Sequence, residues 1–311
     1  MPARLAILAA AFALVVLPAA PRAEPAKQDV PDVTFVAWNV RNYMLSPVKN
    51  GDGRITTPAK TAASAQAVSE TLASLQPDIV GLCEIGTRED LEDLQRRLEQ
   101  SGAHLPYRTW VDGADRERHL ALLSKFPLRE VRHDTKSKFD VGRLPQPVRR
   151  GFLDCTAEIQ PGFRLRILGA HFKSRRIVPE FDQAEVRRNE SLLLGTKIDG
   201  ILQAEPGALL LLFGDLNDNK NAPAIAGLAA RRGGASLSIL ELADRVGDQW
   251  TYHWAESDEY GRVDYVMASK ALLPLLRKKT STVHRAARWD EASDHRPLVV
   301  KIRRPAAGKN R

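Results

Sequence analysis

The stretch LLLLFGDLND, residues 209–218, leads from four leucines into two carboxylates and an amide. A short apolar run bounded by turn-forming residues is typical of a strand buried on both faces, here residues 209–213. Gly214 permits a sharp exit, and Asp215 and Asn217 follow at a strand end, where open sheets place ligands. Because Gly, Asp and Asn are also ordinary turn formers, the stretch by itself favours a simple polar turn. Similar groups at other strand ends would instead indicate a shared site.

Other apolar runs contain or precede the same kinds of polar side chain. The residues concerned are Asn39, Glu84, His171, Asp215, Asn217, Asp264, Asp294 and His295. A buried carboxylate without a partner is destabilising, so several of them at strand ends indicate a shared cation or mutual hydrogen bonds. Oxygen ligands suit a hard ion, with Mg²⁺ expected and Mn²⁺ or Ca²⁺ as alternatives, whereas zinc normally recruits more His or Cys.

The other histidines show no metal-ligand spacing and are interpreted as surface or packing residues. They are His104, His119, His133, His253 and His284.

Strands and helices must position these groups. Apolar runs predict strands at residues 33–40, 79–83, 119–124, 151–159, 164–170, 209–213, 262–268 and 297–302. Apolar residues at helical spacing predict helices at residues 61–75, 88–100 and 183–202. The basic segment 129–150 is expected to be the least regular, and no internal repeat is present. This alternation indicates an α/β protein, although periodicity does not select one α/β fold.

The N-terminal residues are typical of a secretory signal peptide. Arg4 precedes an apolar stretch at residues 5–17, and small residues and prolines follow as far as residue 23. About 13 apolar residues are too few for a membrane span, which needs roughly 20, so no stable membrane anchor is expected. We predict a secreted or periplasmic protein with a signal peptide at 1–23, a linker at 24–32, one catalytic domain at 33–303 and a basic tail at 304–311.

Charge and cysteine content give weaker indications. The chain of 311 residues is 43% hydrophobic and 27% charged, which is enough for a large core in one or two domains. Its formal charge of +8 falls to +6 without residues 1–23, which contain two arginines and no acidic residue. A basic chain favours a polyanionic partner such as nucleic acid. Cys83 and Cys155 form either one disulfide or two small buried packing groups.

Six ordered motifs resemble a known superfamily. They are AWNVRN, DIVGLCEIG, LGAHFKS, LFGDLND, GRVDYV and SDHRPLVV. In this order they are similar to the motifs of the endonuclease/exonuclease/phosphatase superfamily, which includes pancreatic deoxyribonuclease and abasic-site endonucleases. The resemblance spans residues 33–302. It implies a four-layer α/β sandwich of two packed mixed β-sheets flanked by helices, with a site at one edge of the sheets.

The resemblance also implies the metal ligands and substrate contacts. Glu84 would be the main metal ligand, Asn39 would lie beside it and Asp294 would complete the metal site. The cationic residues that follow His171 are predicted to bind substrate, with an exposed charge cluster as the alternative. They are Lys173, Arg175 and Arg176.

Catalytic roles follow from the same resemblance. His171 would contact a phosphate oxygen or protonate the leaving group, Asp215 would orient or deprotonate the attacking water, and Asn217 would hold the phosphate. Asp264 would pair with His295, fixing its tautomer and favouring its charged form. The general base is then either Asp215 or His295. Taken singly, the asparagines are also typical turn residues, Asp264 a partner for a nearby arginine, and His295 a loop residue.

Two further features bear on the substrate. Gly86 occupies the position at which pancreatic deoxyribonuclease carries a minor-groove arginine, so a preference for double-stranded DNA does not carry over. Trp250, Tyr252 and Trp254 are interpreted as packing residues rather than a base-stacking platform.

We therefore predict a secreted, divalent-metal-dependent phosphodiesterase that acts as an endonuclease on DNA or RNA. A sphingomyelinase-like phospholipid phosphodiesterase or a phosphomonoesterase is the alternative, because the superfamily includes such enzymes. A non-catalytic polyanion-binding protein is disfavoured, because all the catalytic groups are present. The number of metal ions, the cleavage polarity and the oligomeric state remain open.

Overall fold

The computed structural model describes residues 31–230 and 236–305. The predicted signal peptide lies outside these residues, as does most of the predicted linker and basic tail. Two six-stranded mixed sheets form the centre of the molecule. No helix within the described ranges has the length and apolar character needed to cross a membrane.

The strands of each sheet come from distant parts of the chain. The first sheet has the order β17 (Thr282–Val283), β18 (Leu298–Ile302), β1 (Val33–Tyr43), β4 (Ile79–Ile85), β6 (His119–Ser124), β5 (Tyr107–Trp110). The second has the order β13 (Ser238–Ile239), β16 (Asp264–Ala268), β12 (Leu210–Asp215), β11 (Phe163–His171), β10 (Phe152–Gln160), β7 (Leu128–Arg129). Small hairpins pair β2 (Val48–Lys49) with β3 (Ile55–Thr57), β8 (Lys138–Val141) with β9 (Leu144–Pro147), and β14 (Tyr252–Trp254) with β15 (Glu259–Gly261).

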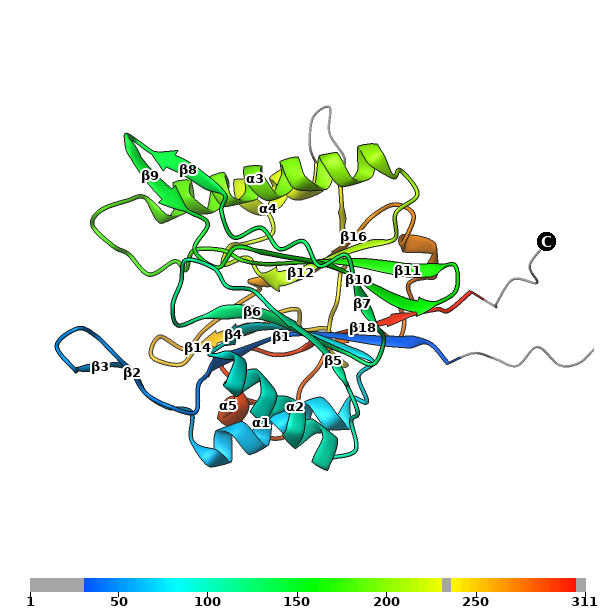
Figure 1. The fold of residues 1–311 in the computed structure, drawn as a ribbon, viewed down its shortest axis with the longest axis horizontal. Helices are drawn as coiled ribbons and strands as arrows, with labels where there is room; N and C mark the ends of the chain where they lie inside the picture. The colour runs from blue at the N-terminus through cyan, green and yellow to red at the C-terminus, as the bar shows by residue number, and fades with distance from the viewer. Residues whose placement is uncertain (1–30, 231–235, 306–311) are drawn as a thin grey trace, which may run out of the picture.

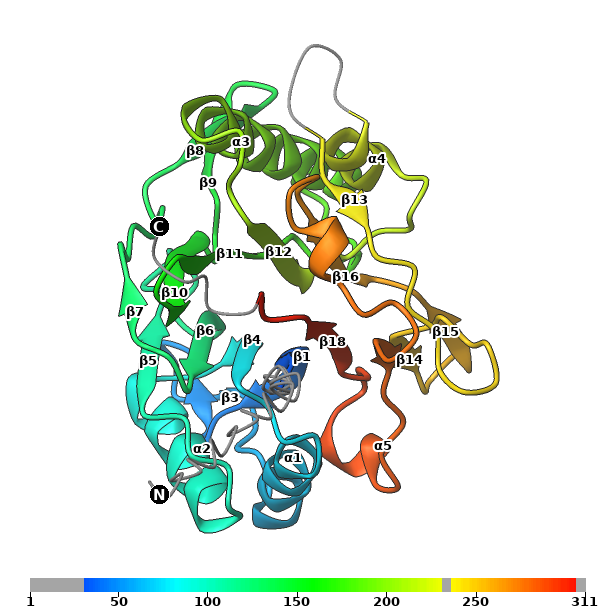
Figure 2. The same ribbon diagram turned by 90° about the vertical axis from the view of Figure 1, so that its right-hand side faces the viewer.

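Helices cover the outer face of each sheet. They are α1 (Ala62–Ser74), α2 (Arg88–Gln100), α3 (Gln183–Ala204), α4 (Pro223–Ala229) and the short α5 (Trp289–Ala292). Figures 1 and 2 show α1 and α2 on one side of the paired sheets and α3 and α4 on the other. This arrangement confirms the predicted four-layer α/β sandwich.

Apolar packing holds the four layers together. The two sheets meet through a buried cluster that includes Phe35 and Phe213, whose ring centroids lie 5.7 Å apart. A Cβ atom on Gly81 or Gly169 would lie less than 3 Å from the ring of Phe213, so these glycines make room for it between the sheets. Helix α2 begins with a capping box between Thr87 and Asp90 and buries its leucine stripe, as its spacing predicts.

Strand direction explains why polar groups from distant segments meet at one edge. Strands β1 and β4 are parallel, as are β11 and β12, so in each pair the two carboxyl ends lie side by side. Strands β16 and β18 run antiparallel to β12 and β1, which brings their first residues to the same edge. The register pairs His171 with Asp215, and Asp215 with Asp264. The predicted site residues are therefore neighbours.

Two local expectations need correction. Gly214 lies within β12 rather than at a turn after it, and the strand continues to Asp215. A Cβ atom there would lie 1.8 Å from the Ala170 carbonyl oxygen, and its φ of +152° also favours glycine, so close strand packing requires it. The segment 129–150, expected to be irregular, contains the β8–β9 hairpin. Of the two alternatives for Cys83 and Cys155, the structure confirms the buried packing groups, because both are free thiols.

Candidate active site

The strained backbone around Glu84 is the first feature of the site edge. Glu84 has a φ of +64°, and Arg41 and Asn42 on the neighbouring strand have φ of +47° and +49°. The β1–β4 pairing is irregular between Asn39 and Tyr43, and the β4–β6 pairing is irregular between residues 82 and 85. Non-glycine residues in this left-handed region are strained by about 1–3 kcal/mol and cluster at functional sites. The bulges turn the Glu84 carboxylate toward β1 instead of leaving it along the strand.

Hydrogen bonds from β1 hold that carboxylate. Oε2 of Glu84 accepts from the backbone N–H of Asn42 at 3.0 Å, and Oε1 accepts from Asn39 Nδ2 at 3.3 Å. The same Asn39 nitrogen donates to Asp215 Oδ2 at 3.0 Å, while Asn39 Oδ1 accepts from the backbone N–H of Arg41. Asn39 thus acts as a donor between two carboxylates in this arrangement. The Asn42 Oδ1 atom is buried and has no hydrogen-bond partner within the described ranges.

Asp215 lies at the centre of the site. Its Oδ1 accepts from the backbone N–H of Asn217 at 3.0 Å. Its Oδ2 lies 3.6 Å from His171 Nε2 and 3.8 Å from His295 Nε2. Burial and then the charge of Asp264 raise the pKa of Asp215 to about 7, against the opposing effect of His295. A carboxylate with such a pKa exchanges a proton readily near neutral pH.

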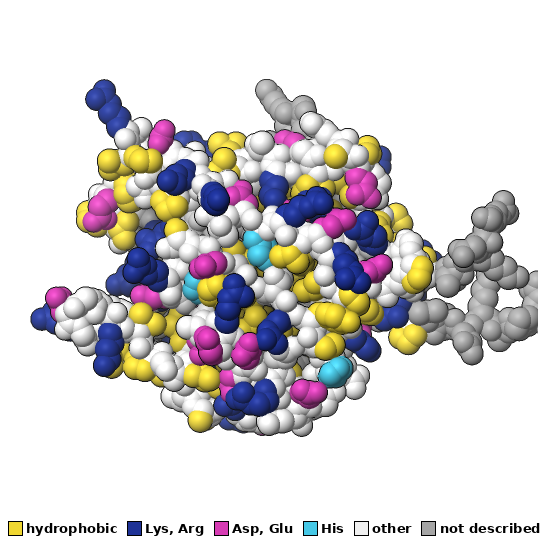
Figure 3. Space-filling model, in the orientation of Figure 1, with side chains coloured by type: hydrophobic (Ala, Val, Ile, Leu, Met, Phe, Trp, Pro, Cys, Tyr) yellow, Lys and Arg dark blue, Asp and Glu magenta, His cyan; other side chains and the backbone are white. Residues whose placement is uncertain are grey.

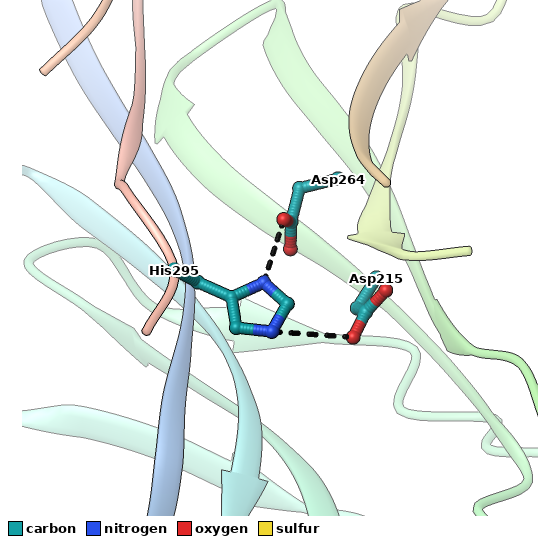
Figure 4. A group of neighbouring side chains, drawn as sticks. All are labelled: Asp215, Asp264 and His295. Atoms are coloured by element: carbon teal, nitrogen blue, oxygen red, sulfur yellow. Dashed lines mark hydrogen bonds and ion pairs between the residues drawn. The ribbon is translucent and has the colours of Figure 1, made fainter. Parts of the chain in front are cut away.

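His295 is held between two carboxylates (Figure 4). Its Nδ1 atom lies 2.7 Å from Asp264 Oδ2, and its Nε2 atom faces Asp215. Burial disfavours the charged ring, but the charge of Asp264, its hydrogen bond and the charge of Asp215 outweigh burial and raise the pKa of His295 to about 10. The raised pKa favours the imidazolium form of His295 at neutral pH, which agrees with the effect expected from its pairing with Asp264.

His171 has the opposite charge state. Burial and then the charges of Arg150 and His295 hold its pKa well below the usual value for histidine. Its Nδ1 atom is buried without a hydrogen-bond partner in the described part of the chain, and Nε2 lies 3.6 Å from Asp215 Oδ2 and 3.9 Å from Glu84 Oε1. A neutral ring that directs Nε2 at two carboxylates carries its hydrogen there. His171 is thus a hydrogen-bond donor facing the centre of the site.

Further contacts fix the positions of Asp264 and His295. The backbone N–H of Asp264 donates to Thr251 Oγ1 at 3.0 Å, and that of His295 donates to Ser293 Oγ at 3.0 Å. Ser293 Oγ in turn donates to the Asn39 carbonyl at 2.7 Å, which ties the segment before β18 to β1. The ring of Tyr252 lies 4.8 Å from the ring of His295. Tyr252 thus packs against a predicted catalytic residue.

The residues suit a hard divalent cation at Glu84 better than at His295. Ligand atoms of Asp215, Asp264 and His295 lie within 4.8 Å of one another, but a protonated imidazole has no lone pair for a metal. Glu84 and Asp294 are the more accessible carboxylates, with side chains 17% and 28% exposed. Glu84 and Asp294 offer carboxylate oxygens, and Asn42 has a buried oxygen without a hydrogen-bond partner among the described residues; oxygen donors are the type that Mg²⁺, Mn²⁺ or Ca²⁺ takes.

Positive side chains border these carboxylates. Asp294 Oδ2 lies 3.6 Å from Arg41 Nε, and Lys60 Nζ donates to the Arg41 carbonyl at 3.1 Å. Burial and then the charge of Arg41 lower the pKa of Lys60 to about 8, with Asp294 and Glu84 opposing the shift. Lys60 was not predicted as a site residue, because no motif contains it and its position depends on the loop before α1.

The three predicted substrate-binding residues differ in their exposure and contacts. Lys173 is half-buried beside the site and donates to the Ser174 side chain at 3.2 Å. Arg175 donates to the Asn217 carbonyl at 3.1 Å and so braces the loop after Asp215. Asn217 itself donates through Nδ2 to the Phe172 carbonyl at 3.1 Å. Arg176 is exposed and makes no ion pair with any described residue. Their roles toward substrate stay predictions.

The structure also shows the surroundings of Gly86 and Trp250, two of the positions considered in relation to the substrate. A Cβ atom on Gly86 would lie 2.2 Å from Asp90 Oδ2, so an arginine at this position would require rearrangement of the α2 cap. Trp250 packs against Tyr260 and Trp289, with the Arg296 guanidinium 4.1 Å from its ring centroid. This packing agrees with the interpretation of Trp250 as a packing residue.

The fold and the site together define the class of protein. A profile of the Endonuclease/Exonuclease/phosphatase family matches residues 36–295, and the chain belongs to this family. Family and fold indicate a phosphoric-ester hydrolase. Members are generally dependent on a divalent metal, and the carboxylate oxygens of Glu84 and Asp294 are compatible with one.

Solved structures share the fold at low sequence identity. The human Nocturnin catalytic domain with bound sulfate is 18% identical, with a TM-score of 0.63 over 87% of this chain and 94% of that chain. Truncated TDP2 from Caenorhabditis elegans is 17% identical, with a TM-score of 0.60 over 88% and 98%. Sphingomyelinase C from Streptomyces griseocarneus is 16% identical, with a TM-score of 0.55 over 88% and 100%. At these identities the likeness concerns the fold alone. A search of curated proteins found no match.

Proposed function

We propose that the chain is a secreted, divalent-metal-dependent phosphodiesterase that hydrolyses nucleic acid. One observation carries the proposal: Asp215 lies between a neutral His171 and a charged His295, at 3.6 and 3.8 Å respectively. A buried carboxylate beside two imidazole groups can supply general-base and general-acid catalysis to the hydrolysis of a phosphate ester. The secreted location rests on the character of residues 1–23.

The charge states favour Asp215 over His295 as the general base. His295 already carries its proton and keeps it through the Asp264 contact of 2.7 Å, so it acts as a donor and as a positive charge. Asp215 has a pKa raised to about 7 and can accept a proton from the attacking water. Asn39 and the Asn217 backbone N–H orient this carboxylate. His171 Nε2–H donates to a phosphoryl or leaving-group oxygen, on which negative charge develops.

Glu84 and Asp294 would hold the divalent cation, with Asn42 Oδ1 as a further oxygen on the same edge. When bound, the cation supplies Lewis-acid polarisation of the phosphate and charge neutralisation. The chain's own residues provide the rest of the chemistry. Deep burial of Asp215 and Asp264 keeps their interaction with His295 strong, because water screens it little.

The choice of nucleic acid as the substrate rests on the positive charge of the chain. The chain carries a formal charge of +8, and on the face drawn in Figure 3 cationic side chains are interspersed with acidic ones. Overall charge supports association with a polyanion but does not mark the binding face. Lys173 and Arg175 follow His171 in sequence, and Arg175 contacts the loop after Asp215. Both would contact backbone phosphates flanking the cleaved bond.

A substrate panel tests the proposal. The chain from residue 24 onward is assayed with Mg²⁺, Mn²⁺ or Ca²⁺ on plasmid DNA, RNA, sphingomyelin and a phosphate monoester. We expect metal-dependent nicking or degradation of nucleic acid that EDTA abolishes. If only sphingomyelin or only the monoester is hydrolysed, the enzyme acts on that alternative substrate class and not on nucleic acid. No hydrolysis of any substrate, together with retained binding of nucleic acid, would establish a non-catalytic polyanion-binding protein instead.

A further inference from the structure

A small cationic cavity lies next to the catalytic edge. It has a volume of about 170 Å³ and is lined by Asp115, Glu117, Arg118, Arg149, Arg150 and Lys173. The lining residues come from the loop before β6, the segment before β10 and the end of β11, and no sequence motif joins them. The backbone N–H of Asp115 donates to the Arg149 carbonyl at 2.6 Å, which fixes the first two segments against each other.

Arg150 is the unusual member of this cavity. It is only 7% exposed, yet its Nε and Nη1 atoms are buried without a hydrogen-bond partner among the described residues. Nε lies 3.1 Å from Asp115 Oδ2, so Arg150 has one ionic contact. Leaving the Nη1 group of this buried guanidinium without a partner is destabilising by about 1–3 kcal/mol. An arginine in this state is prepared for an anionic ligand with several acceptor oxygens.

The acidic side chains do not neutralise the cavity. Asp115 Oδ1 accepts from the backbone N–H groups of Glu117 and Arg118, so this carboxylate caps its own loop. Glu117 Oε2 lies 3.0 Å from Arg118 Nη1 and accepts from Thr57 Oγ1 at 2.9 Å, which directs it toward β3. Four cations against two engaged carboxylates leave an excess of two positive charges. Arg149 is exposed and forms no ion pair with a described residue.

Two of the lining residues, Lys173 and Arg150, connect the cavity to the predicted catalytic residue His171. Lys173 follows His171 by two residues, and its backbone N–H donates to the buried carboxylate of Glu190 at 2.8 Å. The charge of Arg150 is, after burial, the largest influence that lowers the pKa of His171. An anion in the cavity would therefore lie beside any phosphate held by His171.

We propose that this cavity binds a second phosphate group of the substrate, adjacent to the phosphodiester that is cleaved. The inference rests on the proposed function and narrows it to substrates with neighbouring phosphates, as in a polynucleotide chain. Guanidinium groups recognise phosphate through paired N–H donors, and the cavity provides three arginines and a lysine. A lipid headgroup with a single phosphodiester would leave the cavity without its ligand.

Binding of short oligonucleotides tests the proposal without turnover. Thymidine dinucleotides with no terminal phosphate, with a 5′-phosphate and with a 3′-phosphate are titrated calorimetrically in EDTA. The proteins are wild type, Arg149→Gln, and the matched control Lys278→Gln, which removes an exposed cation beyond the far end of β16. Unfolding midpoints confirm that each variant is folded. The quantity of interest is the ratio of affinities with and without the terminal phosphate.

We expect wild type and the control to bind at least one phosphorylated dinucleotide about tenfold more tightly than the unphosphorylated one. Arg149→Gln should reduce this preference to less than about threefold. The proposal is overturned if wild type shows no preference for either phosphorylated dinucleotide, or if both variants lower the preference equally, since general electrostatics would then explain it. Failure of the metal-supported activity panel would refute the proposed function separately, because these titrations require no hydrolysis.

Discussion

The Asp264–His295 pair has a pH-dependent stabilising effect whose sign and size follow from the structure. The two residues are buried, their contact is 2.7 Å long, and the pKa of His295 is raised to about 10. For a raised pKa, stabilisation is complete below the unfolded value of about 6.5 and is lost as pH rises through the folded value. Removing one partner of a buried pair typically destabilises by about 3–5 kcal/mol.

A double-mutant cycle with Asp264→Asn and His295→Gln isolates this pair. We expect a coupling free energy of about 4 kcal/mol at pH 6, measured by urea unfolding. Because one proton is involved, the coupling should fall by about 1.4 kcal/mol for each pH unit between 6.5 and 10. At pH 9 it should be about 0.5 kcal/mol. The cycle cancels effects that each residue has separately, including effects on Asp215.

Coupling that stays constant or increases from pH 6.5 to 10 would refute the charged state of His295. The preference for Asp215 as the general base would then lose its basis, because a neutral His295 could accept the proton itself. The unfolding transition must remain two-state across this pH range for the comparison to hold, which coincidence of fluorescence and circular dichroism transitions checks.

Three further predictions concern single substitutions and the thiols. Glu84→Gln should weaken Mn²⁺ binding by at least about tenfold in calorimetry, because a neutral amide replaces a charged oxygen ligand; unchanged affinity would place the metal elsewhere. Gly214→Ala should lower the free energy of unfolding by about 1–3 kcal/mol in urea, because its Cβ atom would meet the Ala170 carbonyl oxygen; full stability would show that β11 and β12 separate easily. Burial raises the pKa of Cys155 to about 12 and that of Cys83 well above its usual value, so neither thiol should react with Ellman's reagent at pH 8 before unfolding; rapid reaction of the native protein would contradict their burial.

The sequence predicts which residues form the site, but it does not predict their protonation states. Apolar runs place Asp215 and His171 at strand ends, and parallel pairing of β11 and β12 then makes them neighbours. The pairing of Asp264 with His295 follows from the family resemblance, and the structure places them in contact. Opposite protonation states of the two histidines depend on burial and on surrounding charges, which no spacing encodes.

Features that depend on packing between distant segments could not be predicted. The left-handed backbone of Glu84 depends on irregular pairing with both neighbouring strands, so it has no local sequence signal. Arg118 and Arg150 reach one cavity only because the loop before β6 packs against the segment before β10. Gly214 illustrates the opposite error: its residue type suggested a turn, whereas the close approach of β11 explains it.

The most direct test of the proposed site is the single-turnover rate of plasmid DNA cleavage by wild type and His295→Ala in Mg²⁺. We predict that the wild-type protein cleaves the plasmid and that the variant, with its folding verified by circular dichroism, is at least about a hundredfold slower. Equal rates for the two proteins would contradict catalysis at this edge of the sheets, and a wild type that does not cleave plasmid DNA would contradict the proposed action on DNA.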